Sequence, residues 1–331
     1  MGEFDLIARY FTRPAARAVL GIGDDCALLQ PAPGTQVAIS SDMLVEGRHF
    51  FADVDPFTLG HKSLAVNLSD LAACGARPLA FTLALSLPAI DEAWLEAFSR
   101  GLFALADAHG CELVGGDTTR GPLNICITVF GEVPVVNGKS QALLRSGARA
   151  GDDLYVSGTL GDARLALEAL RGNIVLAPDL LAQARQRLEM PTPRVALGQA
   201  LRGVASAAID VSDGLLGDLQ HILTASGIGA TLDTGTAMNL IAAHPHPYWA
   251  TARFDLQKLL EWVLAGGDDY ELAFTAPASA RDAVQAAAVM AATRVTRIGQ
   301  IEAAPGLRLV DNAGQPLAAS FASFDHFLPT P

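Results

Sequence analysis

The sequence predicts an α+β protein built from two mixed α/β domains. Its 331 residues are enough for two ordinary domains, each with its own core. The predicted strands and helices alternate irregularly, whereas a doubly wound sheet needs regular alternation. The polar, glycine-punctuated segment 145–152 (RSGARAGD) separates the two halves of the chain. We therefore expect one domain over 1–148 and a second over 149–331.

Hydrophobic periodicity assigns the elements of the first half. Apolar residues recurring at intervals of three and four predict helices over 4–11, 56–76 and 91–110, the last capped by Asp91 and ended by Gly110. Apolar runs that end in Gly, Ser or Pro predict strands over 18–23, 36–42, 78–88, 111–117 and 124–134. The run 78–88 is apolar throughout and bounded by prolines, which predicts a strand buried on both faces.

The second half opens with a strand, a turn and a helix of its own. The strands expected here are 153–158, 205–210, 270–277 and 296–302. The helices expected here are 161–172, 178–188, 193–203, 215–227, 255–265 and 278–292. This order of elements again favours a mixed α/β domain.

The composition excludes several classes of protein. The net charge is −12 and no run of Lys or Arg interrupts it, so a nucleic-acid partner is not expected. No apolar stretch approaches the ~20 residues of a membrane span. Acidic residues stand near the N-terminus where a signal peptide would need basic ones, so we expect a cytoplasmic protein without a membrane partner. ATP is itself negatively charged, so an acidic protein that binds ATP must also recruit Mg²⁺ to offset the repulsion between protein and nucleotide.

Nine aspartates lie in short clusters that contain Gly or Ser, most of them where an apolar run ends. They are Asp24, Asp25, Asp42, Asp70, Asp117, Asp210, Asp213, Asp268 and Asp269. Carboxylates gathered from several strand ends would repel each other unless cations neutralise them. Hard oxygen ligands with nearby hydroxyls suit Mg²⁺, which often bridges carboxylate to phosphate. The first hypothesis is therefore a nucleotide site with several Mg²⁺ ions.

Some of these aspartates also have a structural interpretation, whereas Asp210 at its strand end has none. In IDVSDGL, the turn from strand to helix leaves N–H groups that can face an anion, but Asp213 could equally be a helix N-cap. In VGGDTTRG, two glycines allow close approach to a ligand, and a tight turn would explain them as well. A helical carboxylate such as Asp70 is usually just solvated.

Gly138-Lys139-Ser140 looks like the end of a phosphate-binding P-loop. That motif needs a glycine five residues before Gly138, and Val133 stands there instead. Asn137-Gly138 between apolar runs favours a hairpin turn. No G-x-G-x-x-G or G-x-S-x-G occurs in a supporting context, so a Rossmann cofactor site and an α/β-hydrolase are not expected.

Eight motifs in order carry a resemblance to a known family. They are GIGDDCA, SSDMLVEGRHF, NLSDLAACGARP, VGGDTTRGP, RSGARAGD, VSGTLGD, IDVSDGL and GGDDYEL. The chain resembles the thiamine-monophosphate kinases, in the superfamily of aminoimidazole ribonucleotide synthetase, selenophosphate synthetase and the hydrogenase-maturation dehydratase. The resemblance implies a homodimer whose N-terminal strands form a shared barrel. It also implies that the N-terminal domain binds metal and nucleotide and that the C-terminal domain completes the cleft and substrate pocket.

The activity implied by the resemblance is phosphorylation of thiamine monophosphate by ATP, the final step of thiamine diphosphate biosynthesis. The transfer is direct and in line, and it uses several Mg²⁺ ions without a discrete acid or base. The implied metal ligands are Asp25, Ser40, Ser41, Asp42, Asp70, Asp117, Asp210 and Asp213. The implied ATP contacts are Gly116, Asp117, Arg145 and Ser212, and the implied substrate contacts are His49, Asp268 and Phe324.

Two positions depart from the family pattern. Asp268 replaces the Glu of GGEDYEL, and Phe324 stands where Tyr or Trp is common. Both changes keep charge or aromatic character.

Three further functions stay open. One open function is that of another ATP-dependent enzyme of the superfamily, such as a purine-pathway synthetase. The chain could also bind Mg²⁺ and a nucleotide without catalysis, or be a purely structural acidic protein.

Overall fold

The computed structural model describes residues 2–242, 246, 256–317 and 321. The chain divides into two compact units. The first holds the chain up to Ala142 except Ala72–Gly75, and the second holds Ala72–Gly75 and the chain from Leu143 onward. Each unit combines helices with a β-sheet, which confirms the predicted α+β class. The division into one domain over 1–148 and another over 149–331 stays a prediction.

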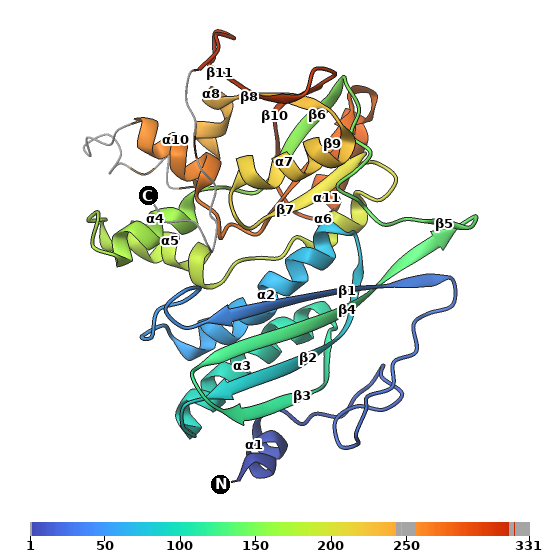
Figure 1. Ribbon diagram of the computed structural model, residues 1–331, viewed down its shortest axis with the longest axis vertical. Helices are drawn as coiled ribbons and strands as arrows, with labels where there is room; N and C mark the ends of the chain where they lie inside the picture. Colours follow the sequence, from blue (N-terminus) through green and yellow to red (C-terminus); the bar gives the residue numbers. More distant parts are fainter. Residues whose placement is uncertain (1, 243–245, 247–255, 318–320, 322–331) are drawn as a thin grey trace. The chain divides into compact units, whose positions relative to one another are not determined.

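The first unit contains a mixed sheet of strand order β1-β4-β2-β3, with β5 paired to β4 (Figure 1). Its strands are β1 (Thr35–Val45), β2 (Arg77–Leu87), β3 (Glu112–Arg120), β4 (Asn124–Val136) and β5 (Lys139–Ser140). Its helices are α1 (Glu3–Tyr10), α2 (Pro56–Ala73) and α3 (Glu92–His109). Only the β2–β3 pair of this sheet is parallel among the described residues. The predicted helices and four of the five predicted strands are thereby confirmed.

The predicted strand 18–23 does not form. Only isolated bridges occur there, Leu20 with Leu28 and Ile22 with Asp24. Gly23 has a φ of 127°, outside the range of a strand. The segment is fixed instead by the Glu112 carboxylate, which accepts the N–H groups of residues 16–18. A short apolar run forms a strand only when another strand pairs with it along its length. The sequence does not show whether such a strand lies next to 18–23.

The two long helices of the first unit pack through glycines. A Cβ at Gly101 on α3 would lie 1.9 Å from the Phe57 carbonyl oxygen of α2, and one at Gly60 would lie 2.1 Å from that of Phe98. Figure 1 shows both helices behind the same face of the sheet. The helix backbones therefore contact each other directly.

Gly101→Ala is expected to lower the free energy of unfolding by about 1–3 kcal/mol, because the added methyl group forces the helices apart. Ala104→Ser, at an exposed position of α3, is the control and should change stability by less than about 0.5 kcal/mol. Urea denaturation measures both. Equal midpoints for the two variants would contradict the close approach.

The opposite face of this sheet is open and exposes large apolar side chains. Side chains alternate along β1, and Ile39 and Met43 are 62% and 53% exposed on that face. Ala84 on β2 pairs with Cys126 on β4, which in turn pairs with Met43, so Ala84 lies on the same face as Met43. Ala84 is exposed there. The prediction that 78–88 is buried on both faces is therefore wrong for the single chain.

The second unit holds a six-stranded sheet of order β11-β8-β10-β6-β9-β7. Its strands are β6 (Asp152–Ser157), β7 (Ala207–Val211), β8 (Gly229–Asp233), β9 (Glu271–Pro277), β10 (Val295–Glu302) and β11 (Gly306–Val310). Its main helices are α4 (Asp162–Leu170), α5 (Pro178–Glu189), α6 (Val195–Ala200), α7 (Leu215–Ser226), α10 (Leu256–Ala265) and α11 (Arg281–Met290). Short helical turns α8 (Thr234–Ala237), η1 (Met238–Leu240) and η2 (Ala278–Ala280) complete it. The strands β8 and β11 were not predicted, because five residues beginning with Gly give little periodic signal.

Two local predictions are confirmed in detail. The Asp91 carboxylate accepts the N–H groups of Ala93 and Trp94 at the start of α3, and Gly110 ends that helix in the left-handed conformation. Asn137 and Gly138 have φ values of 51° and 73° and form the turn between β4 and β5. The Gly-Lys-Ser sequence is therefore part of a hairpin and not of a P-loop.

Candidate active site

An oxygen-rich cluster lies on the helix-covered face of the first sheet. The Ser40 hydroxyl on β1 donates to Asp70 Oδ2 on α2 at 2.5 Å. Asp42 is two residues further along β1 on the same face, and its backbone N–H donates to Asn67 Oδ1 at 3.1 Å. Strand β1 and helix α2 thus bring together three predicted metal ligands, Ser40, Asp42 and Asp70. Asp70 is not a merely solvated helical carboxylate.

Ser41 points away from this cluster. Its hydroxyl lies 2.9 Å from Thr128 Oγ1 on β4 and donates to the Ile127 carbonyl at 3.2 Å. The alternation of a β-strand places it on the open face. Within one chain, the Ser41 side chain and the Asp42 carboxylate therefore lie on opposite faces of the sheet.

Asp117 also lies on the open face. It is in register with Ala84 on β2, and through Ala84 with Cys126 on β4 and Met43 on β1. Asp42 is next to Met43, so its side chain points the other way. The two aspartates stand on the two edge strands, three strand spacings or about 14 Å apart. Because Mg²⁺ holds its ligands at about 2 Å, Asp42 and Asp117 of one chain do not bind the same ion.

Gly116 has a structural reason to be glycine. Its φ is 152°, and a Cβ there would lie 1.9 Å from the Leu83 carbonyl oxygen of β2. The pairing of β2 with β3 shifts register just before this point, between Phe81 and Thr82. The glycine thus accommodates the neighbouring strand, whether or not it also contacts a nucleotide.

Two further predicted residues of the first unit occupy turns. Asp25 is exposed in the irregular segment after Ile22, and its N–H donates to Asp24 Oδ1. The His49 side chain is half-buried, and its Nδ1 accepts the N–H of Val45 at 3.0 Å. Because Nδ1 is the acceptor of that bond, a proton on the neutral ring lies on Nε2.

Strand β7 of the second unit carries Asp210, and the loop between β7 and α7 carries Ser212 and Asp213. Asp210 is buried at the end of β7. The N-cap of α7 is Gly214, without a side-chain cap, so the interpretation of Asp213 as an N-cap is wrong. The N–H groups of residues 212–214 all donate to Asp218 Oδ2, at 3.0–3.2 Å. These three N–H groups precede α7 and are bound by a carboxylate of the protein itself, whereas the role of the N–H groups in the first turn of α7 as an anion site stays a prediction.

Asp218 was missed in the sequence because it lies inside a helix. Burial raises its pKa to about 7, the negative charge of Asp213 adds to this, and the three N–H groups act in the opposite direction. The spacing S-D-G-x-x-x-D was the available signal, since a helical side chain leans toward the N-terminus of its own helix.

A second loop approaches the same place. Asp268 and Tyr270 have φ values of 61° and 51°, a strained conformation for residues other than glycine. The Asp268 N–H donates to the Ser212 carbonyl at 2.7 Å, and the Tyr270 N–H donates to the Val211 carbonyl at 2.8 Å. The structure thus brings Asp268 next to the β7–α7 loop, which carries two other predicted site residues, Ser212 and Asp213.

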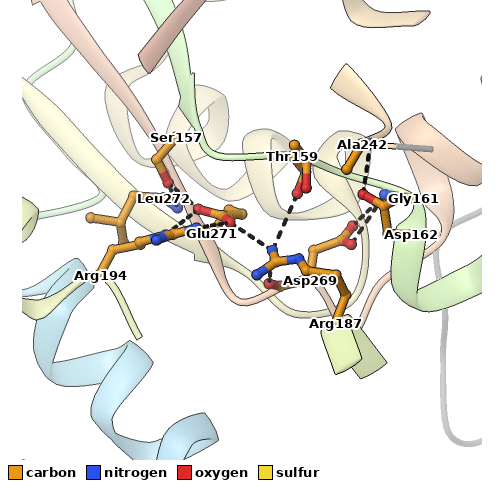
Figure 2. A network of polar contacts seen from close by, with 10 residues as sticks. All are labelled: Ser157, Thr159, Gly161, Asp162, Arg187, Arg194, Ala242, Asp269, Glu271 and Leu272. Carbon is orange, nitrogen blue, oxygen red and sulfur yellow. Dashed lines mark hydrogen bonds and ion pairs between the residues drawn. The ribbon is translucent and has the colours of Figure 1, made fainter. Parts of the chain in front are cut away.

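Buried acids on either side of Tyr270 hold this strained loop. Figure 2 shows Glu271 between Arg187, Arg194 and Ser157, which come from separate segments. Its carboxylate accepts bonds from both arginines and from the Ser157 hydroxyl at 2.5–2.6 Å. Burial lowers the pKa of Arg194, but the hydrogen bond to Glu271 and the negative charge of Glu271 together outweigh burial, so the pKa rises.

Asp269 is the second anchor of the loop. Its carboxylate accepts the N–H of Gly161 at the start of α4, at 3.0 and 3.1 Å to its two oxygens (Figure 2). Burial raises its pKa well above the usual range, and the Gly161 bond offsets this only partly. The motif GGDDYEL therefore contains one half-buried acid, Asp268, and two structural acids, Asp269 and Glu271.

Two predicted contacts remain, the ATP contact Arg145 and the substrate contact Phe324. Arg145 is exposed in the loop before β6, and its carbonyl accepts the Ser226 hydroxyl at 3.4 Å. Phe324 lies outside the described residues.

The donor atoms fit Mg²⁺ better than a softer metal. Around Ser40, Asp42 and Asp70 the side chains offer hydroxyl, carboxylate and amide oxygens. In the part of the chain that the structure describes, no three His, Cys, Asp or Glu side chains form a ready-made metal group. Mg²⁺ usually takes one or two carboxylates and completes its shell with water and phosphate. Over the same described residues, no helix is long and apolar enough to cross a membrane.

Comparisons with known proteins define the class first. The family model "AIR synthase related protein, N-terminal domain" matches residues 23–133, and its C-terminal counterpart matches residues 149–312. Together with the two α/β units, these matches define a two-domain protein of the AIR synthase related class.

Individual relatives narrow the class. The chain is 47% identical to the thiamine-monophosphate kinase of Salmonella typhimurium, over 98% of both chains. It is 45% identical to the crystal structure of thiamine-monophosphate kinase from Stenotrophomonas maltophilia K279a, with a TM-score of 0.81 over 92% of this chain and 94% of that chain. AaThiL complexed with AMPPCP and TMP is 28% identical, with a TM-score of 0.76 over 90% of this chain and 89% of that chain. The chain belongs to the thiamine-monophosphate kinase family.

Proposed function

We propose that this chain transfers a phosphoryl group from ATP to thiamine monophosphate, giving thiamine diphosphate and ADP, the last step of thiamine diphosphate biosynthesis. The observation that carries the proposal is the 47% identity to a thiamine-monophosphate kinase along 98% of both chains. A relative of similar fold is complexed with AMPPCP, an ATP analogue, and TMP. The oxygen-rich ends of β1, β3 and β7 supply the chemistry that such a reaction needs.

Several Mg²⁺ ions are part of this proposal. Both substrates are phosphorylated, and bound Mg²⁺ supplies the positive charge that allows two anions to approach in a chain of net charge −12. Ser40, Asp42 and Asp70 would hold metal in the first unit, and Asp210 and Asp213 in the second. Within one chain, Asp117 is too far from Asp42 to bind the same ion. Asp117 would therefore bind a separate Mg²⁺ ion, either held by the protein or brought in with a substrate phosphate.

Transfer is proposed to be direct. The acceptor is an ionised phosphate oxygen, so it needs positioning more than a strong base. The proposed site residues are mainly carboxylates and hydroxyls that would hold metal, and a covalent route would need a nucleophile with an activating base. Phosphate from ATP should therefore leave on thiamine diphosphate and not remain on the protein.

The test is coupled detection of ADP and thiamine diphosphate from purified protein with Mg²⁺, ATP and thiamine monophosphate. Equal molar amounts of both products are expected. An aminoimidazole precursor in place of thiamine monophosphate is the control for a purine-pathway synthetase and should give no ADP above background. Absence of thiamine diphosphate, or turnover of the control substrate alone, would refute the proposal.

A homodimer in the cytoplasm completes the proposal. The open face of the first sheet exposes Ile39 and Met43, and a monomer with such an apolar face is prone to association. Pairing this face with its copy would cover both, in agreement with the barrel implied by the family resemblance.

Ile39→Glu is expected to convert the dimer to a monomer, because it places two like charges in the proposed apolar interface. Val289→Glu is the matched control, since Val289 is 80% exposed on α11 of the second unit. Light scattering at micromolar concentration should give the dimer mass for the wild type and for the control. A monomeric wild-type chain would contradict the interface.

A further inference from the structure

Asp218 makes an unusual set of bonds with the loop that precedes its own helix. Its Oδ2 accepts the N–H groups of Ser212, Asp213 and Gly214, at 3.0, 3.1 and 3.2 Å. The side chain is only 4% exposed, so water does not replace these bonds readily. Three consecutive N–H groups are thereby directed at one oxygen.

This arrangement is not an ordinary helix cap. An N-cap side chain precedes the helix and accepts the N–H groups of its first turn. Asp218 instead lies inside α7, where its own N–H donates to the Gly214 carbonyl at 3.0 Å, and its carboxylate reaches back to groups outside the helix. Its bonds therefore fix the path of the loop and not only the end of the helix.

The loop fixed in this way carries two proposed site residues of the second unit, Ser212 and Asp213. A third, Asp210, is the last but one residue of β7, the strand that leads into this loop. The Ser212 carbonyl also accepts the Asp268 N–H at 2.7 Å. One buried carboxylate thus connects the positions of Ser212, Asp213 and Asp268.

We propose that Asp218 is a positioning residue of the kinase site, which sets the loop 212–214 by accepting its three N–H groups. The proposal rests on the proposed function for its kinetic consequence, but its structural part stands alone. It also follows that these three N–H groups are not available to a substrate phosphate.

The test compares Asp218→Ala, Asp218→Asn and a matched control, Asp233→Asn. Asn keeps an oxygen acceptor of nearly the same shape at position 218, whereas Ala removes it. The Asp233 carboxylate accepts the N–H groups of Gly235 and Thr236 at the start of α8, in the same unit but in another loop. The control therefore alters a similar carboxylate-to-backbone contact outside the proposed site.

The first measurement is amide hydrogen exchange of the protein without ligand, read on peptides that cover 211–219. Asp218→Ala should exchange the amides of 212–214 at least about tenfold faster, since each loses its acceptor, while the β9 peptides 271–277 stay protected. Asp218→Asn should restore most of the protection, and Asp233→Asn should leave it unchanged. Wild-type exchange in Asp218→Ala would overturn the proposal, as would an Asn variant as exposed as the Ala variant.

The second measurement separates positioning from stability. Asp218→Ala and Asp233→Asn can both lower the melting temperature, but only Asp218→Ala should lower kcat/KM for ATP by about tenfold or more, with most of that loss recovered in Asp218→Asn. Full activity of Asp218→Ala would overturn the proposal. If the wild-type chain forms no thiamine diphosphate, the proposed function fails, and hydrogen exchange still decides whether Asp218 sets the loop.

Discussion

Replacing Glu271 by alanine is expected to lower the free energy of unfolding of the second unit by about 3–5 kcal/mol, the usual cost of removing one partner from a buried ion pair. Glu271 is fully buried and is bonded to Arg187 and Arg194, which are themselves largely buried. The variant would leave two arginines facing each other without a counter-charge. It would also release the Ser157 hydroxyl, which donates to Glu271 and accepts the N–H of Leu272.

Urea denaturation followed by circular dichroism measures this loss. The control is Glu189→Gln, which removes the charge from an i,i+4 helical pair with Arg185, in which the arginine side chain is 40% and the glutamate side chain 14% exposed. A helical pair of this kind, with one partner still in contact with solvent, contributes about 0.5 kcal/mol. If Glu271→Ala is no less stable than Glu189→Gln, the buried network does not hold the GGDDYEL loop.

Replacing Asp42, Asp117 or Asp210 by asparagine is expected to reduce turnover at least about tenfold each, corresponding to ~1.4 kcal/mol in the activation barrier. Asn keeps the shape of Asp but removes the charge that would hold Mg²⁺ against the phosphates. The three residues lie on β1, β3 and β7, so no single local turn needs all three. Without metal, loss of repulsion between carboxylates should keep or raise the melting temperature.

Steady-state rates over a range of Mg²⁺ concentrations check this prediction. Excess Mg²⁺ should restore only part of the activity, because ligand geometry is lost together with occupancy. Asp91→Asn is the matched control, since Asn caps a helix about as well as Asp and should leave both rate and stability unchanged. Near wild-type rates of all three variants at limiting Mg²⁺ would refute a site with several metal ions.

Local chemistry was the reliable part of the sequence prediction. The Asp91 cap, the Gly110 end of α3 and the Asn137-Gly138 turn depend on residues a few positions apart, so the sequence shows cause and effect together. Long helices were predicted for the same reason, because their periodicity is read within a single segment. Family motifs in order then pointed to the class that the comparisons confirmed.

The partners of the acidic residues were decided by tertiary structure alone. No spacing shows that Glu271 meets Arg187 and Arg194, more than seventy positions earlier. Strand register, set by pairing across the sheet, placed Asp42 and Asp117 on opposite faces, although both follow apolar runs in the same way. The run 18–23 likewise lacked a neighbouring strand.

The sequence by itself therefore determined the α+β class, most helices and strands, and which carboxylates belong to the family motifs. Tertiary structure decided that one of those carboxylates, Asp269, is bound by a backbone N–H group, and that Asp218, which lies outside the motifs, binds three more. The physical reason is that burial and hydrogen bonding depend on contacts between distant segments. An aspartate in a glycine-rich motif looks the same in sequence whether it binds a cation or holds a loop.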